Sequence, residues 1–106
     1  MQEVLTFLSQ LQQNNTREWM QEHQKKYQNA KAVFLELVAQ LGEAISAFDS
    51  RLEHIEPKKC MFRLARDVRF GKDKTPYKVH FGAILSEEGK KTEKPFYYLH
   101  IEPNGK

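Results

Sequence analysis

The chain has 106 residues, of which 40% are hydrophobic and 29% are charged, a composition that indicates one globular domain and excludes disordered and fibrous classes. No apolar run approaches the roughly 18 residues that span a bilayer, and the N-terminus lacks the basic and apolar regions of a signal peptide. The single cysteine, Cys60, cannot form an internal disulfide. We therefore expect a cytoplasmic protein with no membrane partner.

The net charge of +3 is unevenly distributed along the chain. Residues 1–56 hold five Lys or Arg against eight Asp or Glu, residues 57–80 hold eight against two, and residues 81–106 hold four of each. The positive charge therefore lies almost wholly in the middle segment. A local excess of this kind favours an anionic partner without identifying it.

A first helix is predicted over residues 2–12, where apolar residues recur with the helical period; these are Val4, Leu5, Phe7, Leu8 and Leu11. Polar residues then break the pattern. Asn15 resembles an N-cap, and Glu18 is placed to complete a capping box. A second helix is therefore expected to begin near Thr16.

The second helical pattern continues almost to Asp49, which makes it longer than most globular helices. We therefore expect a break near residues 22–26. Gly42 falls on the predicted polar side, where it would weaken the helix only mildly. Residues 1–49 as a whole are predicted to be helices that cover one face of a sheet.

The period of the sequence changes after residues 49–59, which have loop composition with Pro57 as a stop. Residues 60–65 alternate as a half-buried strand does. In this pattern Cys60, Phe62 and Leu64 share the core face, and Met61, Arg63 and Ala65 share the other. Residues 66–77 lose the alternation and contain Gly71 and Pro76, so we expect a loop with room for one helical turn at 67–70.

Two further strands form a predicted hairpin, from Val79 to Leu85 and from Phe96 to Glu102. The parity of the apolar residues places the odd-numbered side chains of both strands on the core face and the even-numbered ones on the opposite face.

If Leu85 pairs near Pro95, then His80 lies opposite His100; Lys78, Tyr98 and Glu102 are neighbours on the same face. Metal binding by His80, His100 and Glu102 is chemically reasonable, yet no tight ligand spacing supports it. We expect no metal and no cofactor. Cys60 is interpreted as a core residue.

The chain ends at Asn104-Gly105-Lys106, and Asn-Gly is a strong turn signal that no strand follows here. We expect a protein that continues beyond this turn. The last strand would then have an unpaired edge, which favours self-association.

The densest charge lies between Arg63 and Tyr77. Arginine offers planar donors suited to phosphate or carboxylate, so one hypothesis is a site for a small anionic ligand, with Asp67 and Asp73 orienting the arginines and Tyr77 supplying a hydroxyl or a stacking ring. The predicted ligand-binding residues are Arg63, Arg66, Asp67, Arg69, Asp73, Lys74, Tyr77, His80 and His100, with Lys72 and Lys78 adding charge.

Two alternatives remain open for the same residues. In the first, the charges bind nucleic acid or an acidic partner, which is less favoured because the first half of the chain is acidic and no nucleic-acid module is recognisable. In the second, Asp67 and Asp73 pair with the arginines and brace the loop. No residue is assigned a catalytic role, and the sequence does not decide whether the protein is an enzyme.

The segment resembles the signature of DUF2461, a family of uncharacterised bacterial proteins: Arg-x-x-Arg-Asp-x-Arg-Phe, then Asp/Asn-Lys-x-x-Tyr. The matching residues are Arg63, Arg66, Asp67, Arg69, Phe70, Asp73, Lys74 and Tyr77. The flanks at residues 14–19, 80–82 and 97–103 are also similar. Because family members are typically about twice as long, the resemblance implies that the chain is an N-terminal half; it implies no activity.

Together these patterns predict a single α+β domain over residues 1–106, with helices in residues 1–49 and strands and the charged segment in residues 60–106. The helices are expected to pack on one face of a small, mainly antiparallel sheet.

Overall fold

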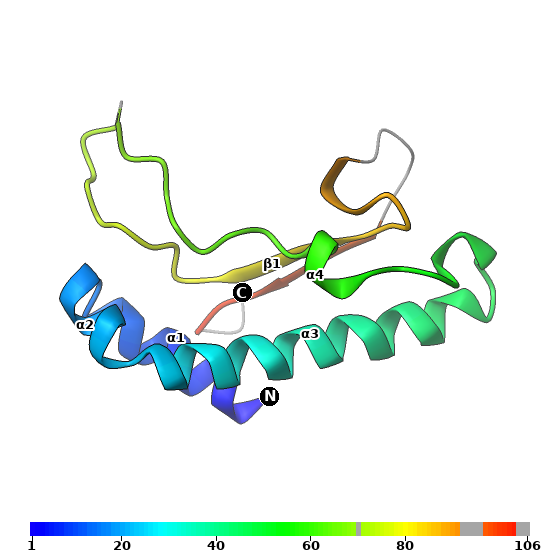
Figure 1. The fold of residues 1–106 in the computed structure, drawn as a ribbon, viewed down its shortest axis with the longest axis horizontal. Coiled ribbons are helices and arrows are strands. Elements are labelled where there is room, and N and C mark those ends of the chain that lie inside the picture. Colours follow the sequence, from blue (N-terminus) through cyan, green and yellow to red (C-terminus); the bar gives the residue numbers. More distant parts are fainter. Residues whose placement is uncertain (70, 92–96, 104–106) are drawn as a thin grey trace.

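The computed structural model describes residues 1–69, 71–91 and 97–103 and shows an α+β fold (Figure 1). The helical part comprises α1 (Gln2–Gln13), α2 (Arg17–Glu22) and α3 (Gln24–Ser46). The rest comprises the short helices η1 (Ser50–Leu52), α4 (Pro57–Cys60) and η2 (Gly89–Lys91), and the strands β1 (Phe81–Leu85) and β2 (Tyr97–Ile101). The predicted fold class is confirmed.

Helices α1 and α3 form a layer along one face of the sheet (Figure 1). Their apolar stripes meet β1 in a common core, which explains the helical period of the sequence. Its largest fully buried side chains are Val4, Leu8, Leu11, Phe34, Val38, Cys60, Phe81 and Leu85. The break expected near residues 22–26 is confirmed at His23, whose Nδ1 lies 2.7 Å from the carbonyl oxygen of Trp19.

The predicted N-cap of α2 is wrong by one residue. Thr16 is the cap, and its hydroxyl accepts a hydrogen bond from the backbone N–H of Trp19 at 3.1 Å. Pro57 also behaves differently from the prediction, because it begins α4 instead of ending an element.

Gly42 is buried, contrary to the prediction that it lies on the polar side of its helix. A Cβ at this position would overlap the side chain of Ile55. The absence of a side chain therefore lets the segment after α3 pack directly on the helix.

Within the described residues the sheet has two strands, and β1 is contacted along both of its edges. Ala83 pairs with Leu99 of antiparallel β2 on one edge and, through an isolated bridge, with Met61 on the other. Within the described residues no strand pairs with the outer edge of β2, so self-association along this edge stays a prediction.

The parity of the hairpin is confirmed, because Phe81, Ala83 and Leu85 are buried and pair with odd-numbered residues of β2. The register is wrong by two residues: Leu85 pairs with Tyr97. The connection is longer than predicted and includes the turn of η2, where Gly89 has a φ of 65°.

The predicted strand over residues 60–65 is only partly formed. Cys60 belongs to α4, and the following residues form two isolated bridges, one from Met61 to Ala83 of β1 and one from Ala65 to Tyr77, which precedes β1. Met61 is buried while Phe62 lies on the opposite face beside Tyr98, so the assigned faces of these two residues are reversed. The reason is the turn of α4, which ends one residue before Met61 and resets the alternation.

Phe70, Pro95 and the Asn104-Gly105 turn lie outside the described residues. No helix in the described part of the chain has the length and apolar character needed to cross a membrane.

Candidate functional site

Residues 66–76 form a closed loop, called here the motif loop, that rises above the end of the molecule where α2 lies (Figure 1). Its base is fixed by backbone hydrogen bonds from Arg66 N–H to the Pro76 carbonyl and from Lys78 N–H to the Leu64 carbonyl, both 2.9 Å long. In the described part of this loop no helical turn forms, so the turn that the sequence allowed at 67–70 is not observed.

The two aspartates of the motif loop each organise a turn. Asp67 Oδ1 accepts from the backbone N–H of Arg69 at 3.2 Å, and Asp73 Oδ1 accepts from the backbone N–H of Thr75 at 2.9 Å. Such contacts between an aspartate and the backbone two residues later explain why short acidic side chains stand at these positions.

Both aspartates also pair with arginines of the loop. Arg69 donates from Nε and Nη2 to the two oxygens of Asp67, at 3.1 and 3.0 Å, and Arg66 Nη1 lies 3.0 Å from Asp73 Oδ2. Hydrogen bonds from Arg69 lower the pKa of Asp67, while those from Thr75 and Arg66 lower the pKa of Asp73 to about 2. The carboxylates therefore stay ionised and paired at neutral pH.

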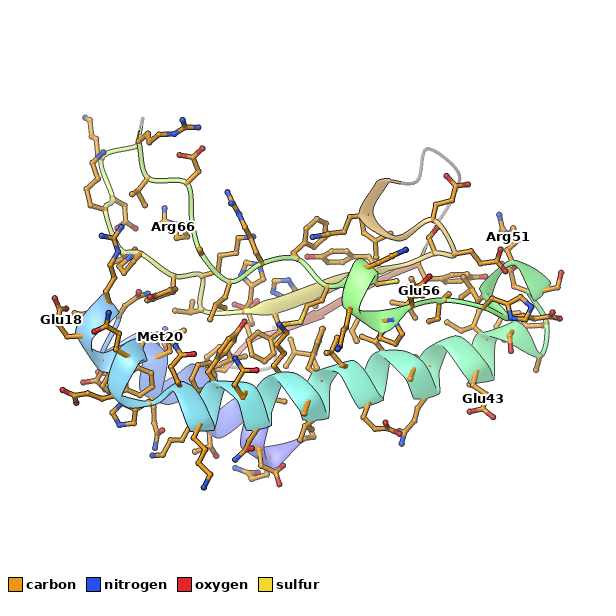
Figure 2. All side chains as sticks on the ribbon, in the orientation of Figure 1. Glu18, Met20, Glu43, Arg51, Glu56 and Arg66 are labelled. Carbon is orange, nitrogen blue, oxygen red and sulfur yellow. The ribbon has the colours of Figure 1, made fainter. Side chains whose placement is uncertain are left out.

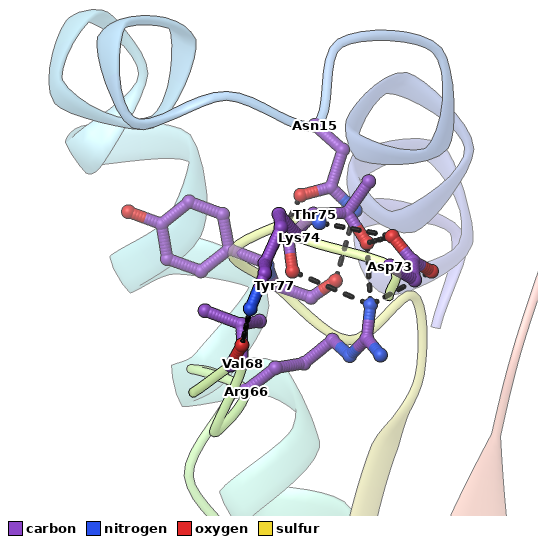
Figure 3. A network of polar contacts seen from close by, with 7 residues as sticks. All are labelled: Asn15, Arg66, Val68, Asp73, Lys74, Thr75 and Tyr77. Carbon is purple, nitrogen blue, oxygen red and sulfur yellow. Dashed lines mark hydrogen bonds and ion pairs between the residues drawn. The ribbon is translucent and has the colours of Figure 1, made fainter. Parts of the chain in front are cut away.

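Thr75 and Lys74 complete this network (Figure 3). The Thr75 hydroxyl donates to Asp73 at 2.8 Å and accepts from Arg66, which also donates to the Thr75 carbonyl at 3.3 Å. Lys74 Nζ donates to the carbonyl of Val68. These contacts are the ones expected if the charged side chains hold the motif loop in shape.

The motif loop is also tied to the helical layer by Asn15. Its side-chain Nδ2 donates to the Tyr77 carbonyl at 2.8 Å, and its Oδ1 accepts from the Tyr77 N–H at 3.1 Å (Figure 3). The two residues are 62 positions apart. The Tyr77 ring packs against the core instead of facing solvent fully, so it anchors the loop.

The sheet surface that faces away from α1 and α3 carries a second group of side chains, called here the open sheet face: Phe62, His80, Tyr98, His100 and Glu102. The His80 and His100 rings stack with their centroids 4.5 Å apart. His100 Nε2 lies 3.2 Å from Glu102 Oε1, and its Nδ1 lies 3.4 Å from the Tyr98 hydroxyl. The predicted proximity of His80 and His100 is therefore confirmed despite the change of register.

Gly82 makes room for this arrangement. A Cβ at Gly82 would lie 2.9 Å from the Tyr98 hydroxyl oxygen and 3.6 Å from a ring carbon of Phe62. The Tyr98 side chain thus leans across β1 only because the residue opposite His100 has no side chain.

Lys78 adjoins the open sheet face, and Arg63 lies near enough for its charge to act on Lys78; these two cations are called here the cation pair. Lys78 Nζ lies 5.7 Å from the centroid of the Phe62 ring. Burial, followed by the charges of Arg63 and Lys90, lowers the pKa of Lys78. Within the described residues neither side chain of the cation pair forms an ion pair or a hydrogen bond, although the charge of Arg63 contributes to the lowered pKa of Asp67.

His80 connects the cation pair to the rest of the open sheet face. Burial is the largest cause of its lowered pKa, and the charges of His100 and Lys78 act in the same direction. Among the described residues no three His, Cys, Asp or Glu side chains are grouped so that they could hold a metal ion.

A shallow groove separates the motif loop from the start of α2, at the end of the molecule where the labelled Glu18 and Arg66 lie (Figure 2). Its lining mixes both charges, with Arg17, Lys72 and Lys74 facing Glu18 and Asp73. This groove therefore has a weaker excess of positive charge than the cation pair.

The structure divides the predicted site residues into two groups. Arg66, Asp67, Arg69, Asp73 and Lys74 lie in the network of the motif loop, and Tyr77 lies at its base. His80 and His100 stack on the open sheet face, and the charge of Arg63 acts on Lys78. The sequence interpretation missed the roles of Asn15, Thr75 and Gly82. The Asp-x-Thr spacing could have indicated the turn at Thr75, whereas Asn15 and Gly82 act through contacts distant in sequence.

Comparison with known proteins gives one family: that of the conserved hypothetical protein DUF2461, which matches residues 3–106. No curated protein matches the chain, and no solved structure does.

Proposed function

The chain belongs to the DUF2461 family, and we propose that it binds a small phosphorylated or carboxylated ligand beside the open sheet face. The observation that supports this proposal is the contrast among the cations. Arg66 and Arg69 pair with aspartates, whereas the cation pair has no carboxylate within ion-pair distance among the described residues.

The chemistry of the cation pair suits an oxyanion. Arg63 supplies a planar set of donors and Lys78 a point charge, and together they match a phosphate or a carboxylate. The two like charges lie close enough to lower the pKa of Lys78. Burial contributes more to this lowering than the repulsion does, and a bound anion would oppose both by favouring the charged form of Lys78.

In this proposal the predicted ligand-binding residues take separate roles. Arg63, His80 and His100 belong to the site with Lys78. Arg66, Arg69 and Lys74 hold the motif loop in place through their contacts with Asp73, Asp67 and Val68.

A thermal-shift series with inorganic phosphate, pyrophosphate and citrate tests the proposal. At ten times the Kd, binding stabilises the folded state by about 1.4 kcal/mol, which raises the Tm by several degrees. Arg63→Gln should abolish the shift, and the matched change Lys25→Gln on α3 should retain it. A shift that Arg17→Gln abolishes and Arg63→Gln retains would place the ligand in the groove beside α2 and contradict the proposal.

A second candidate function is binding of nucleic acid, favoured by the exposure of Tyr98, whose ring lies near that of Phe62, the contact of Lys78: the residue is 54% exposed, and bases stack on such rings. Affinity for single strands would then fall by about 0.7 log units per log unit of salt for each phosphate contacted. A flat salt response would exclude this candidate.

We further propose a reducing, cytoplasmic location, which is supported by the free thiol of Cys60 in the core.

A further inference from the structure

Tyr98, His100 and Glu102 occupy alternate positions along the end of β2 and form a hydrogen-bonded series. The Tyr98 hydroxyl lies 3.4 Å from His100 Nδ1, and His100 Nε2 lies 3.2 Å from Glu102 Oε1. Both contacts lie on the open sheet face. The imidazole is therefore held between a phenol and a carboxylate.

The direction of these hydrogen bonds follows from the chemistry of the partners. An ionised carboxylate can only accept, so the His100 nitrogen that faces Glu102 carries the hydrogen. The other nitrogen of a neutral imidazole is an acceptor, and the Tyr98 hydroxyl donates to it. This is the orientation in which a carboxylate fixes a histidine as a base for a hydroxyl group.

The surroundings fit a proton transfer between Tyr98 and His100. Gly82 leaves the space into which the Tyr98 hydroxyl leans. The side chains of His100 and Glu102 are 31% and 34% exposed, and Tyr98 is 54% exposed, so a substrate from solvent can reach the whole series. The stacked His80 has a lowered pKa and is neutral at pH 7, so it does not oppose a positive charge on His100.

We propose that Glu102, His100 and Tyr98 form a proton relay that makes Tyr98 a nucleophile towards an electrophilic phosphoryl or acyl centre. Tyr98 Oη forms the new bond, and the bond to the leaving group breaks, with its electron pair going to the leaving group. The phenol proton passes to His100 Nδ1, and Glu102 stabilises the imidazolium that forms. His100 then gives the proton to the leaving group. The proposed function bears only on the substrate, which would be an anionic phosphoryl or acyl ester. The relay itself is argued from the contacts among Tyr98, His100 and Glu102.

A neutral probe, benzenesulfonyl fluoride, tests the relay with the full chain. Its S–F bond breaks and fluoride leaves, an S–O bond forms at the tyrosine, and the phenol proton passes to His100. Peptide mapping by mass spectrometry gives the labelling rate of Tyr98 and of its neighbour Tyr97, whose hydroxyl donates to Asp49 at 3.2 Å.

We expect Tyr98 to react about tenfold faster than Tyr97 or more, as general-base assistance allows. Exposures of 54% and 37% account for less than a twofold difference between them. His100→Phe should reduce the rate at Tyr98 to that at Tyr97, and the nearly isosteric Glu102→Gln should reduce it in part.

Lys25→Gln, at an exposed position of α3 outside both sites, serves as the control, and labelling of Tyr98 should be unchanged in this variant. Equal rates at Tyr97 and Tyr98, or a Tyr98 rate that neither His100→Phe nor Glu102→Gln lowers, would overturn the relay whether or not phosphate binds. Fast, His100-dependent labelling without phosphate binding would overturn only the proposed function.

Discussion

The motif loop and the cation pair are both rich in positive charge, but their charges have different surroundings. In the motif loop Arg66 and Arg69 meet aspartates at 3.0 Å. Beside the open sheet face, burial and then the charge of Arg63 lower the pKa of Lys78. The first arrangement stabilises the folded chain and the second destabilises it.

The arginines of the family signature therefore differ in their surroundings, since some pair with aspartates and one lies near another cation. A paired arginine holds its own chain in shape, because its donors are already occupied. An unpaired one near other cations costs stability, and such a cost is expected at functional sites. The density of charge in the sequence therefore does not distinguish the arginines that pair with aspartates from Arg63, which we propose for ligand binding.

The largest effect on stability is expected from the link between the motif loop and the helical layer. Asn15→Ala leaves both backbone groups of half-buried Tyr77 without their partner, and the free energy of unfolding should fall by about 2 kcal/mol. Urea unfolding measures the change. Asn14→Ala is the matched control, since the Asn14 side chain donates to the Gln10 carbonyl in an exposed contact and its backbone hydrogen bonds do not need that side chain. Equal losses for both variants would show that Asn15 does not hold the loop.

Arg66→Ala should lower the free energy of unfolding by about 1 kcal/mol, because it removes the contacts to Asp73 and Thr75. Arg63→Ala should change it by less than about 0.5 kcal/mol, as expected of an exposed residue without these partners. If Arg63→Ala lowered the free energy of unfolding more than Arg66→Ala does, the distinction between the motif loop and the cation pair would be wrong.

Because the contacts of Thr75 and Arg66 lower the pKa of Asp73 to about 2, the stability that ionised Asp73 contributes through them is full above pH 4. It is lost as the pH falls towards 2.

His80 should give the open sheet face a pH dependence of the same sign as that of Asp73, but at a higher pH. Its pKa in the folded chain lies below the ordinary value of 6.5, so the unfolded chain binds the proton more tightly. Stability should therefore fall as the pH drops through 6.5, and His80→Gln should flatten this dependence. Urea unfolding at pH 7.5 and pH 5.5 measures it, with His54→Gln as a control at a side chain that is 84% exposed. A slope that His80→Gln leaves unchanged would contradict the account.

The smallest effect is expected from Lys78→Met, which keeps the contact with Phe62 and removes a partly buried charge. Stability at pH 7 should rise by up to about 0.5 kcal/mol, because a lowered lysine pKa means that the charged form costs stability below pH 10.5. Phosphate binding should be lost in the same variant. Lys25→Met, at an exposed position of α3, should change neither property. A clear loss of stability in Lys78→Met would show that Lys78 has a stabilising partner.

The helices and the parity of the hairpin could be predicted because both depend on local periodicity. Phe81, Ala83 and Leu85 alternate along the strand whatever lies opposite them. The register could not be predicted, because it depends on how many residues the connection uses, and the sequence around Gly89 allows more than one length. The turn of α4 likewise reversed the faces assigned to Met61 and Phe62.

The sequence was enough to predict which residues make up the candidate charged segment. It was not enough to predict that they form two groups, the motif loop and the cation pair. The sequence shows which residues are charged, whereas the partner of each arginine depends on the conformation of the motif loop. Asp67 reaches Arg69, and Asp73 reaches Arg66 across the loop. Asn15 was interpreted through its near neighbours, but its observed partner, Tyr77, is 62 residues away.

The most direct test follows the arginine side chains by NMR while inorganic phosphate is added. The Nε–Hε resonance of Arg63 should shift saturably, together with the imidazole resonances of His80, and those of Arg66 and Arg69 should stay in place. Shifts at Arg66 and Arg69 with Arg63 unchanged would contradict the account and assign the anion to the motif loop.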